Sequence, residues 1–232
     1  MSHGKKYLEA AKKVDATKLY SLDEAVKLAL ETATTKFDSS VEVHMNLGID
    51  TAIAEQALRS TVALPHGTGK KVRVIAFVSE DEAKMAKDAG AIEAGAETLV
   101  DKIAGGWMDF DVAVANPAMM KSMGKIARQL GQAGLMPNPK SGTVTTDIKG
   151  TIAQIMKGQV EFRNDKQGNL HNIVGKVSFG DQKIMENVKA YLKAIMEKRP
   201  TGIKGVFVRS ITLTSTMGPG VKVEVNPTIS GL

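Results

Sequence analysis

The sequence predicts an α/β protein with two domains, in which an α+β arrangement at both ends of the chain flanks an inserted α/β domain. Strands with alternating apolar and polar residues, typical of a sheet with one wet face, occur near both ends. A continuously apolar strand, typical of a parallel sheet buried on both faces, lies in the middle. The pattern changes at Gly69 and changes back after Gly158.

The N-terminal part predicts two helices followed by a strand. Two helices are expected within the first 33 residues, and Ser21 with Glu24 forms a capping-box pattern at the start of the second. In Val41–Leu47 every second residue is apolar, and Glu42, His44 and Asn46 point the other way. We therefore expect one face of this strand to be core and the other to be wet or to bind a partner.

The middle part alternates strands and helices, which indicates a parallel α/β unit. Val72–Val78 is an apolar strand, and Ser79 begins a helix with three acidic residues in its first turn. Val112–Ala115 is a second strand, and the pair Asn116-Pro117 is a typical start for a helix, expected to end near Gly131.

The C-terminal part returns to an antiparallel pattern. A helix is expected at Ile148–Met156, followed by a hairpin whose strands, Gln159–Asn164 and Leu170–Val174, flank a turn at residues 165–169. The remaining elements are a long amphipathic helix and two final strands, at Asp181–Lys198, Gly205–Ser215 and Val221–Val225.

Composition limits the class of protein. The net charge is +6 and the pI about 9.3, and residues 158–232 alone contribute +5, which favours an anionic partner. The absence of cysteine excludes disulfides and thiolate chemistry. Without an apolar run of about 18 residues or a secretory signal, we expect a soluble cytosolic protein with no membrane partner.

No motif supports catalysis, a cofactor or a metal. Residues 66–70, HGTGK, resemble part of a phosphate-binding P-loop, but Leu64 and Lys71 stand where glycine and a hydroxyl residue are required. The acidic helix start after Val72–Val78 would repel a bound phosphate. The four histidines, His3, His44, His66 and His171, lack metal-ligand spacing. We interpret His66, Gly67 and Gly69 as a flexible joint.

Two polar segments suggest RNA binding. Residues 36–40, KFDSS, precede the first alternating strand, and the run after residue 209 places hydroxyls at every second position before Met217 and Gly218. A solvated threonine-rich strand is the simpler interpretation of the second segment alone. Together, hydroxyls, short acids and glycines suit ribose 2′-OH groups of structured RNA. The hairpin adds possible phosphate contacts at Arg163, Lys166, His171 and Lys176.

The glycine- and proline-punctuated segment 131–146, GQAGLMPNPKSGTVTT, predicts an ordered loop. It closely resembles the signature segment of the bacterial ribosomal protein L1 family. Four further segments match the family in its order: KFDSSVEVHMNLGID, TVALPHGTGKKVRV, VEFRNDKQGNLHNIVGK and LTSTMGPGVKV. The chain departs from the family at Gln132-Ala133, where a Pro-Arg pair is usual, and in residues 55–60.

The resemblance implies a discontinuous RNA-binding domain of residues 1–66 and 159–232 and an inserted Rossmann-like domain of residues 67–158. It implies a monomeric, cofactor-free constituent of the large ribosomal subunit that binds the ribosomal RNA of the mobile stalk and contacts the tRNA in the exit (E) site. It also implies repression of the protein's own messenger RNA. Gly158 would complete the hinge. The expected RNA-binding residues are Lys36, Phe37, Ser40, Glu42, His44, Asp165, Lys166, His171, Lys176, Ser210, Thr212, Thr214, Thr216, Met217 and Gly218.

Two other function classes stay open at this point. The inserted α/β domain could serve an enzyme or a nucleotide-dependent regulator, which a nucleotide panel in a thermal-shift assay would reveal. A general RNA chaperone would bind RNA without choosing its target.

Overall fold

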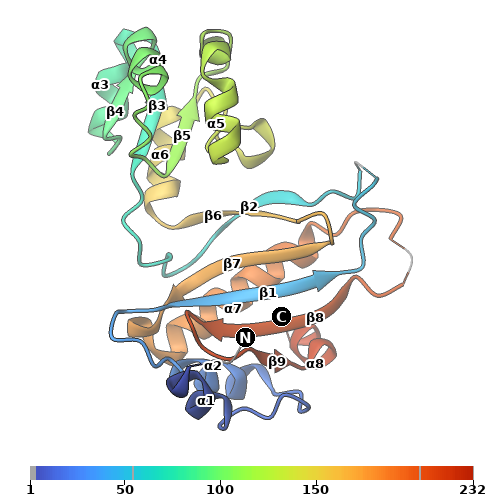
Figure 1. Cartoon of the computed structure of the whole chain (residues 1–232). Helices are drawn as coiled ribbons and strands as arrows, with labels where there is room; N and C mark the ends of the chain where they lie inside the picture. Colours follow the sequence, from blue (N-terminus) through green and yellow to red (C-terminus); the bar gives the residue numbers. More distant parts are fainter. Residues whose placement is uncertain (1–3, 54, 204, 232) are drawn as a thin grey trace. The chain divides into compact units, whose positions relative to one another are not determined.

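The computed structural model describes residues 4–53, 55–203 and 205–231, which form two compact units (Figure 1). Unit 1 contains the residues up to Gly69 together with those from Val160 onward, and unit 2 is Lys70–Gln159. His3 lies outside the described residues. No helix in the described part of the chain is long and apolar enough to cross a membrane.

The main sheet of unit 1 is antiparallel and joins distant parts of the sequence. Strand β1 (Ser40–Leu47) lies in its centre, between β7 (Asn169–Lys176) and β8 (Val208–Ser215), and β9 (Val221–Val223) pairs with β8 at the edge. Both termini therefore supply the sheet, as Figure 1 shows by the blue, orange and red strands lying side by side.

The core of unit 1 lies on one face of this sheet, under helices α2 (Leu22–Glu31) and α7 (Gly180–Glu197). The predicted alternation of β1 is confirmed, since its four apolar side chains are buried and the residues between them are partly exposed. The capping box is also confirmed: the Ser21 hydroxyl accepts a hydrogen bond from the Glu24 backbone N–H, and the Glu24 carboxylate accepts one from Ser21 N–H. Helices α1 (Lys5–Ala11) and α8 (Val225–Ser230) complete the unit.

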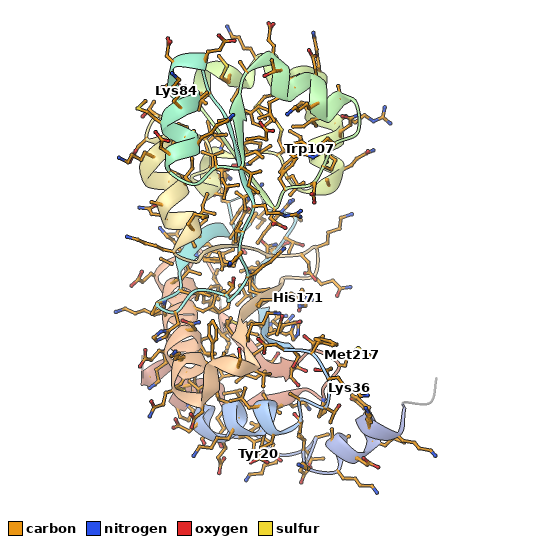
Figure 2. The ribbon with its side chains drawn as sticks, turned by 90° about the vertical axis from the view of Figure 1, so that its left-hand side faces the viewer. Tyr20, Lys36, Lys84, Trp107, His171 and Met217 are labelled. Atoms are coloured by element: carbon orange, nitrogen blue, oxygen red, sulfur yellow. The ribbon has the colours of Figure 1, made fainter. Side chains whose placement is uncertain are left out.

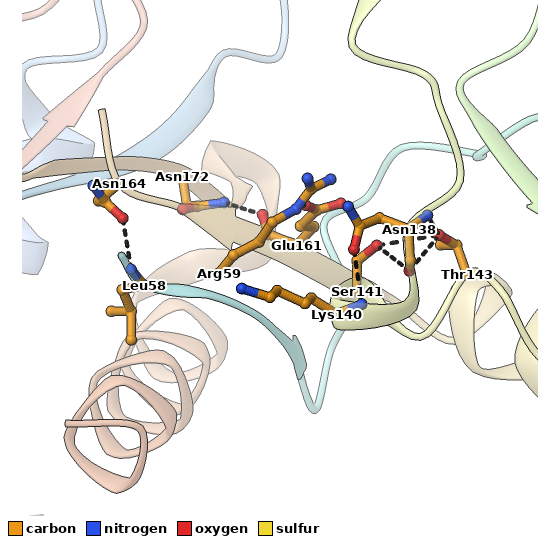
Figure 3. A network of polar contacts seen from close by, with 9 residues as sticks. All are labelled: Leu58, Arg59, Asn138, Lys140, Ser141, Thr143, Glu161, Asn164 and Asn172. Carbon is orange, nitrogen blue, oxygen red and sulfur yellow. Dashed lines mark hydrogen bonds and ion pairs between the residues drawn. The ribbon is translucent and has the colours of Figure 1, made fainter. Parts of the chain in front are cut away.

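The predicted hairpin of residues 159–174 is wrong in its pairing. Strand β6 (Gln159–Arg163) pairs with β2 (Arg59–Ala63), whereas β7 pairs with β1. The turn between β6 and β7 does form, closed by Asp165. Beyond the turn, however, β7 pairs with β1, and Arg59 of β2 forms an ion pair with Glu161 of β6 (Figure 3). Turn composition predicts the bend but not the partner of each strand.

Unit 2 is a three-layer α/β unit around a parallel sheet of order β4 (Glu93–Gly95), β3 (Val74–Phe77), β5 (Val112–Ala115). Alternate β3 residues belong to different cores, which explains its continuous apolar sequence. The helices on the two faces are α4 (Glu97–Ala104) and α5 (Ala127–Ala133) on one, and α3 (Glu80–Asp88) and α6 (Ile148–Met156) on the other.

The helix expected from Pro117 to about Gly131 is interrupted. Two 3₁₀ turns, η1 (Pro117–Met120) and η2 (Ser122–Lys125), precede α5. Asn116 caps the first turn as predicted, by accepting a hydrogen bond from Ala118 N–H. Gly124 in the middle of the segment lowers its helix propensity, which favours short turns. The sequence interpretation missed β2, β4, α4 and α8, and β4 is too short to show a period.

Candidate nucleic-acid interface

The face of the main sheet opposite the core is polar, and we call it the outer face. The register of β1 and β8 places Glu42 beside Thr214, His44 beside Thr212 and Asn46 beside Ser210. On the other side of β1, β7 contributes its own outward-pointing residues. The outer face consists of Glu42, His44, Asn46, Asn169, His171, Ile173, Ser210, Thr212 and Thr214, all at least partly exposed.

Two histidines meet in the centre of the outer face. The Nδ1 atoms of His44 and His171 are 2.8 Å apart, and their ring centroids are 5.0 Å apart. A carboxylate lies beyond each ring, Glu42 at 3.5 Å from His44 Nε2 and Asp165 at 3.7 Å from His171 Nε2. Partial burial, and then the neighbouring His171, lower the pKa of His44. The pair therefore shares one hydrogen bond and favours a neutral His44.

One end of the outer face is bordered by two loops, which we call the rim: residues 36–40 and residues 216–218. The Thr216 hydroxyl accepts a hydrogen bond from Ser40 N–H (3.0 Å) and donates to Ser40 C=O (3.3 Å). The Lys176 ammonium donates to the Ser40 hydroxyl at 2.9 Å. Ser40 is buried, so its hydroxyl holds Lys176 in place and is not free to meet a ligand.

Met217 of the rim combines an unusual backbone conformation with an exposed apolar side chain. It is the one non-glycine residue in the described part of the chain with a positive φ, 65°, and its side chain is 75% exposed. Phe37 on the facing loop is 61% exposed. Figure 2 shows Met217 and Lys36 close together on the side of unit 1 that also carries His171. Backbone strain with an exposed apolar side chain is typical of functional sites.

The conformation of Met217 is fixed by its neighbours. Gly218 N–H donates to Ser215 C=O at 2.8 Å, and the single proton of the Thr214 hydroxyl is within hydrogen-bonding reach of the carbonyls of Ser215 (3.1 Å), Gly218 (3.2 Å) and Pro219 (3.3 Å). A Cβ atom at Gly218 would lie 2.3 Å from the hydroxyl oxygen of buried Ser215, so any other residue would have to displace Ser215. Thr214 therefore shapes the rim from within.

A shallow cavity of about 580 Å³ opens beside Met217 and Phe37. The start of α1 and the loop before β1 form its walls, and lysines surround the apolar floor. The lining residues are Gly4, Lys5, Lys6, Tyr7, Thr34, Thr35, Lys36, Phe37 and Met217.

The turn before β7 is held by Asp165. Its carboxylate accepts hydrogen bonds from Asn169 N–H, the Asn169 side chain and Gln167 N–H, which lower the pKa of Asp165 to about 2. Asp165 is therefore a turn-forming residue, with exposed Lys166 next to it in the turn and His171 of the outer face 3.7 Å from its carboxylate. The turn also receives a hydrogen bond from the Thr51 hydroxyl to Lys166 C=O.

The expected hinge residues are more constrained than a flexible joint. Buried Asn187 of α7 accepts a hydrogen bond from His66 N–H (3.0 Å) and donates to Gly67 C=O (2.9 Å) and Val174 C=O (2.7 Å). His66 Nε2 also lies 2.5 Å from Glu186. Gly67 and Gly69 adopt positive φ, as does buried Gly158 after α6. Residues 66–67 are thus tied to unit 1.

Three residues of this region were not among the expected site residues: Asn46, Asn169 and Asn187. Asn46 and Asn169 form an amide hydrogen bond of 2.7 Å across β1 and β7. The alternation of β1 already placed Asn46 on the outer face, but its partner required the strand register. Asn187 carried no signal, because a single polar residue in an amphipathic helix does not reveal burial. The described residues contain no group of three or more His, Asp or Glu side chains that could hold a metal.

Comparison with known proteins places the chain in one family. Residues 29–219 match the profile described as the ribosomal protein L1p/L10e family. The chain is 52% identical to the large ribosomal subunit protein uL1 of Fervidobacterium nodosum, over 99% of this chain and 98% of that one. The uL1 proteins of Chloroflexus aurantiacus (53%, covering 96% and 95%) and Thermobifida fusca (49%, covering 98% and 97%) are similar to the same extent. The chain therefore belongs to the ribosomal protein L1 family, whose members are structural ribosomal proteins and not enzymes.

Proposed function

We propose that the protein, as a constituent of the large ribosomal subunit in the cytoplasm, binds the ribosomal RNA of the mobile stalk through the outer face and the rim of unit 1. The observation that carries this proposal is the strained, exposed Met217 beside exposed Phe37, at the end of a sheet face made of hydroxyl, amide and imidazole groups. Such a surface offers hydrogen bonds to ribose 2′-OH groups and an apolar contact for a ribose or base.

The residues divide into two roles in this proposal. Ser210, Thr212, His171 and Asn46 meet the RNA from the outer face, while Lys36, Phe37 and Met217 meet it at the rim. Four residues act through others: Ser40 holds Lys176, Asp165 holds Lys166, Thr214 holds the loop before Pro219, and Thr216 joins the two loops of the rim. Gly218 permits the close approach of backbone.

We further propose that the protein contacts E-site tRNA and other ribosome components, assists release of deacylated tRNA, and represses its own messenger through an RNA that presents the same shape. In this account the free protein is a monomer and requires no cofactor. A surface that recognises RNA shape binds two RNAs of equivalent shape, which is the physical basis for coupling subunit assembly to messenger repression.

The rim and the outer face are tested by measuring the affinity of stalk RNA for Met217→Ala and Thr212→Ala. Removing one packing or polar interaction is expected to weaken binding by about 1–3 kcal/mol. Met85→Ala and Thr201→Ala are matched controls, because both residues are exposed and lie outside the outer face and the rim. If both test variants bind stalk RNA with unchanged affinity while circular dichroism shows that they are folded, the outer face and the rim do not bind this RNA.

A further inference from the structure

The charges of unit 2 are segregated along the sequence. Residues 80–111 contain nine acidic and three basic residues. Residues 112–146 contain no acidic residue, and their charged residues are Lys121, Lys125, Arg128 and Lys140, which we call the basic edge. All four side chains are exposed.

The fold places part of the acidic segment and the segment after β5 at opposite edges of the unit 2 sheet. In the sheet order β4-β3-β5, α3 and β4 of the acidic segment lie toward the β4 edge, whereas η1, η2 and α5 follow β5 at the other edge (Figure 1). One side of the segment after β5 is fully buried, through Met123, Ile126 and Leu130. The exposed side of the same segment carries Lys121, Lys125 and Arg128.

The fourth basic residue is presented by an ordered loop at the carboxyl end of β5. Ala115 N–H of β5 donates to Thr143 C=O at 2.8 Å. Asn138 then closes the loop: its side chain accepts from Lys140 N–H at 2.8 Å, and its N–H donates to the Thr143 hydroxyl at 2.8 Å (Figure 3). Lys140 therefore projects from a fixed backbone.

No residue of the basic edge is neutralised within the described protein. The ion pairs of unit 2 join Lys70, Arg73 and Lys102 to acids at residues 93–111. Exposed cations that form no ion pair contribute little to folding and raise the local potential for a polyanion.

We infer that the basic edge of unit 2 is a second RNA-binding surface, which contacts the phosphate backbone of duplex RNA without reading its sequence. This surface is chemically different from the outer face of unit 1, and the inference is independent of the proposed function. The outer face offers hydroxyl and amide groups, whereas the basic edge offers point charges and a guanidinium group, the usual partners of phosphate.

The test uses the full chain, an RNA duplex of unrelated sequence, and the variant Lys121→Gln/Lys125→Gln/Arg128→Gln. Glutamine keeps a polar side chain and a similar helix propensity while removing the charge. The control is Lys84→Gln/Lys87→Gln/Lys149→Gln, which removes the same charge from exposed lysines of the α3 and α6 layer (Figure 2 labels Lys84). Affinity is measured over a range of salt concentrations, and thermal unfolding checks the fold of each variant.

The slope of log K against log salt should become shallower by about 1 for each phosphate interaction that is removed, or by about 3 in the test variant. The affinity of the test variant for the duplex at low salt should fall at least about tenfold. The control should retain most of the wild-type slope. Equal effects of the two variants would overturn the inference, since net charge alone would then explain binding. Binding of polyglutamate, an anionic polypeptide, is measured with the same variants. If the test variant loses polyglutamate binding but keeps RNA binding, the basic edge binds acidic polypeptides and not RNA, and the inference is overturned. Stalk-RNA affinity, measured in the same variants, reports separately on the outer face.

Discussion

The replacement Asn187→Ala tests how residues 66–67 are tied to unit 1. Asn187 is fully buried in α7 and makes three hydrogen bonds, one from His66 N–H and two to the carbonyls of Gly67 and Val174. No other side chain in the described structure joins these three backbone groups. Alanine removes all three bonds and leaves their backbone partners without a replacement.

The expected cost follows from these bonds. Each contributes about 1 kcal/mol net, and partly buried groups left without partners add to the cost, while the higher helix propensity of alanine returns about 0.5 kcal/mol. We therefore expect the free energy of unfolding of unit 1 to fall by about 3 kcal/mol. Gln182→Ala, at an exposed position of the same helix, should change it by less than about 0.5 kcal/mol.

The assay is urea unfolding followed by two probes. Trp107 is the single tryptophan and lies in unit 2, so its fluorescence reports that unit, while far-UV circular dichroism reports both. In Asn187→Ala the transition of unit 1 should move to lower urea while the fluorescence transition of unit 2 stays in place. Faster hydrogen exchange at His66 N–H should accompany the shift. A change below about 1 kcal/mol, or no change in exchange at His66, would show that these bonds do not anchor the segment.

Three further predictions concern the interface. Met217→Gly should raise the stability of unit 1 by about 1 kcal/mol, because glycine adopts positive φ without strain, yet weaken stalk-RNA binding; lower stability in thermal unfolding would contradict this. The pKa of His44 is lowered in the folded protein, so the folded state favours the neutral ring. The free energy of unfolding should therefore fall as the pH drops below 6.5, and more steeply in wild type than in His44→Gln. Identical pH profiles of the two proteins would refute this coupling. The pKa of Asp165 is lowered from 3.8 to about 2, so its contribution to stability is present above pH 3.8 and is lost as the pH falls through about 2; Asp165→Asn should lack this part of the acid transition.

Local sequence patterns correctly predicted the elements that depend on interactions between residues close in sequence. The capping box of α2, the alternation of β1 and the Asn116-Pro117 start of η1 each depend on residues within a few positions, and each is confirmed. The same reasoning failed where the competing interaction is distant. The turn around Asp165 suggested a hairpin, but β6 pairs with β2 about a hundred residues away in sequence, a partner that no local pattern identifies.

The candidate interface shows the same division. Alternation in β1 and in residues 210–216 was enough to predict a polar face, because the period of a strand fixes which residues share a side. It could not predict that His44 meets His171, or that Thr216 bonds to Ser40, because both contacts join different strands or loops. It also treated hydroxyls as free that the structure engages internally, as in Thr214 and Ser40.

The central claim is that unit 1 recognises the shape of stalk RNA mainly through uncharged groups. The most direct test is the affinity of the purified protein for stalk RNA and for a scrambled RNA of equal length, each at low and at high salt. We predict that stalk RNA binds selectively and that its affinity depends weakly on salt, because few contacts of the outer face involve phosphate, whereas binding of the scrambled RNA collapses in salt. Equal affinity for both RNAs, with a steep slope of the size expected for about eight phosphate contacts, would contradict the account.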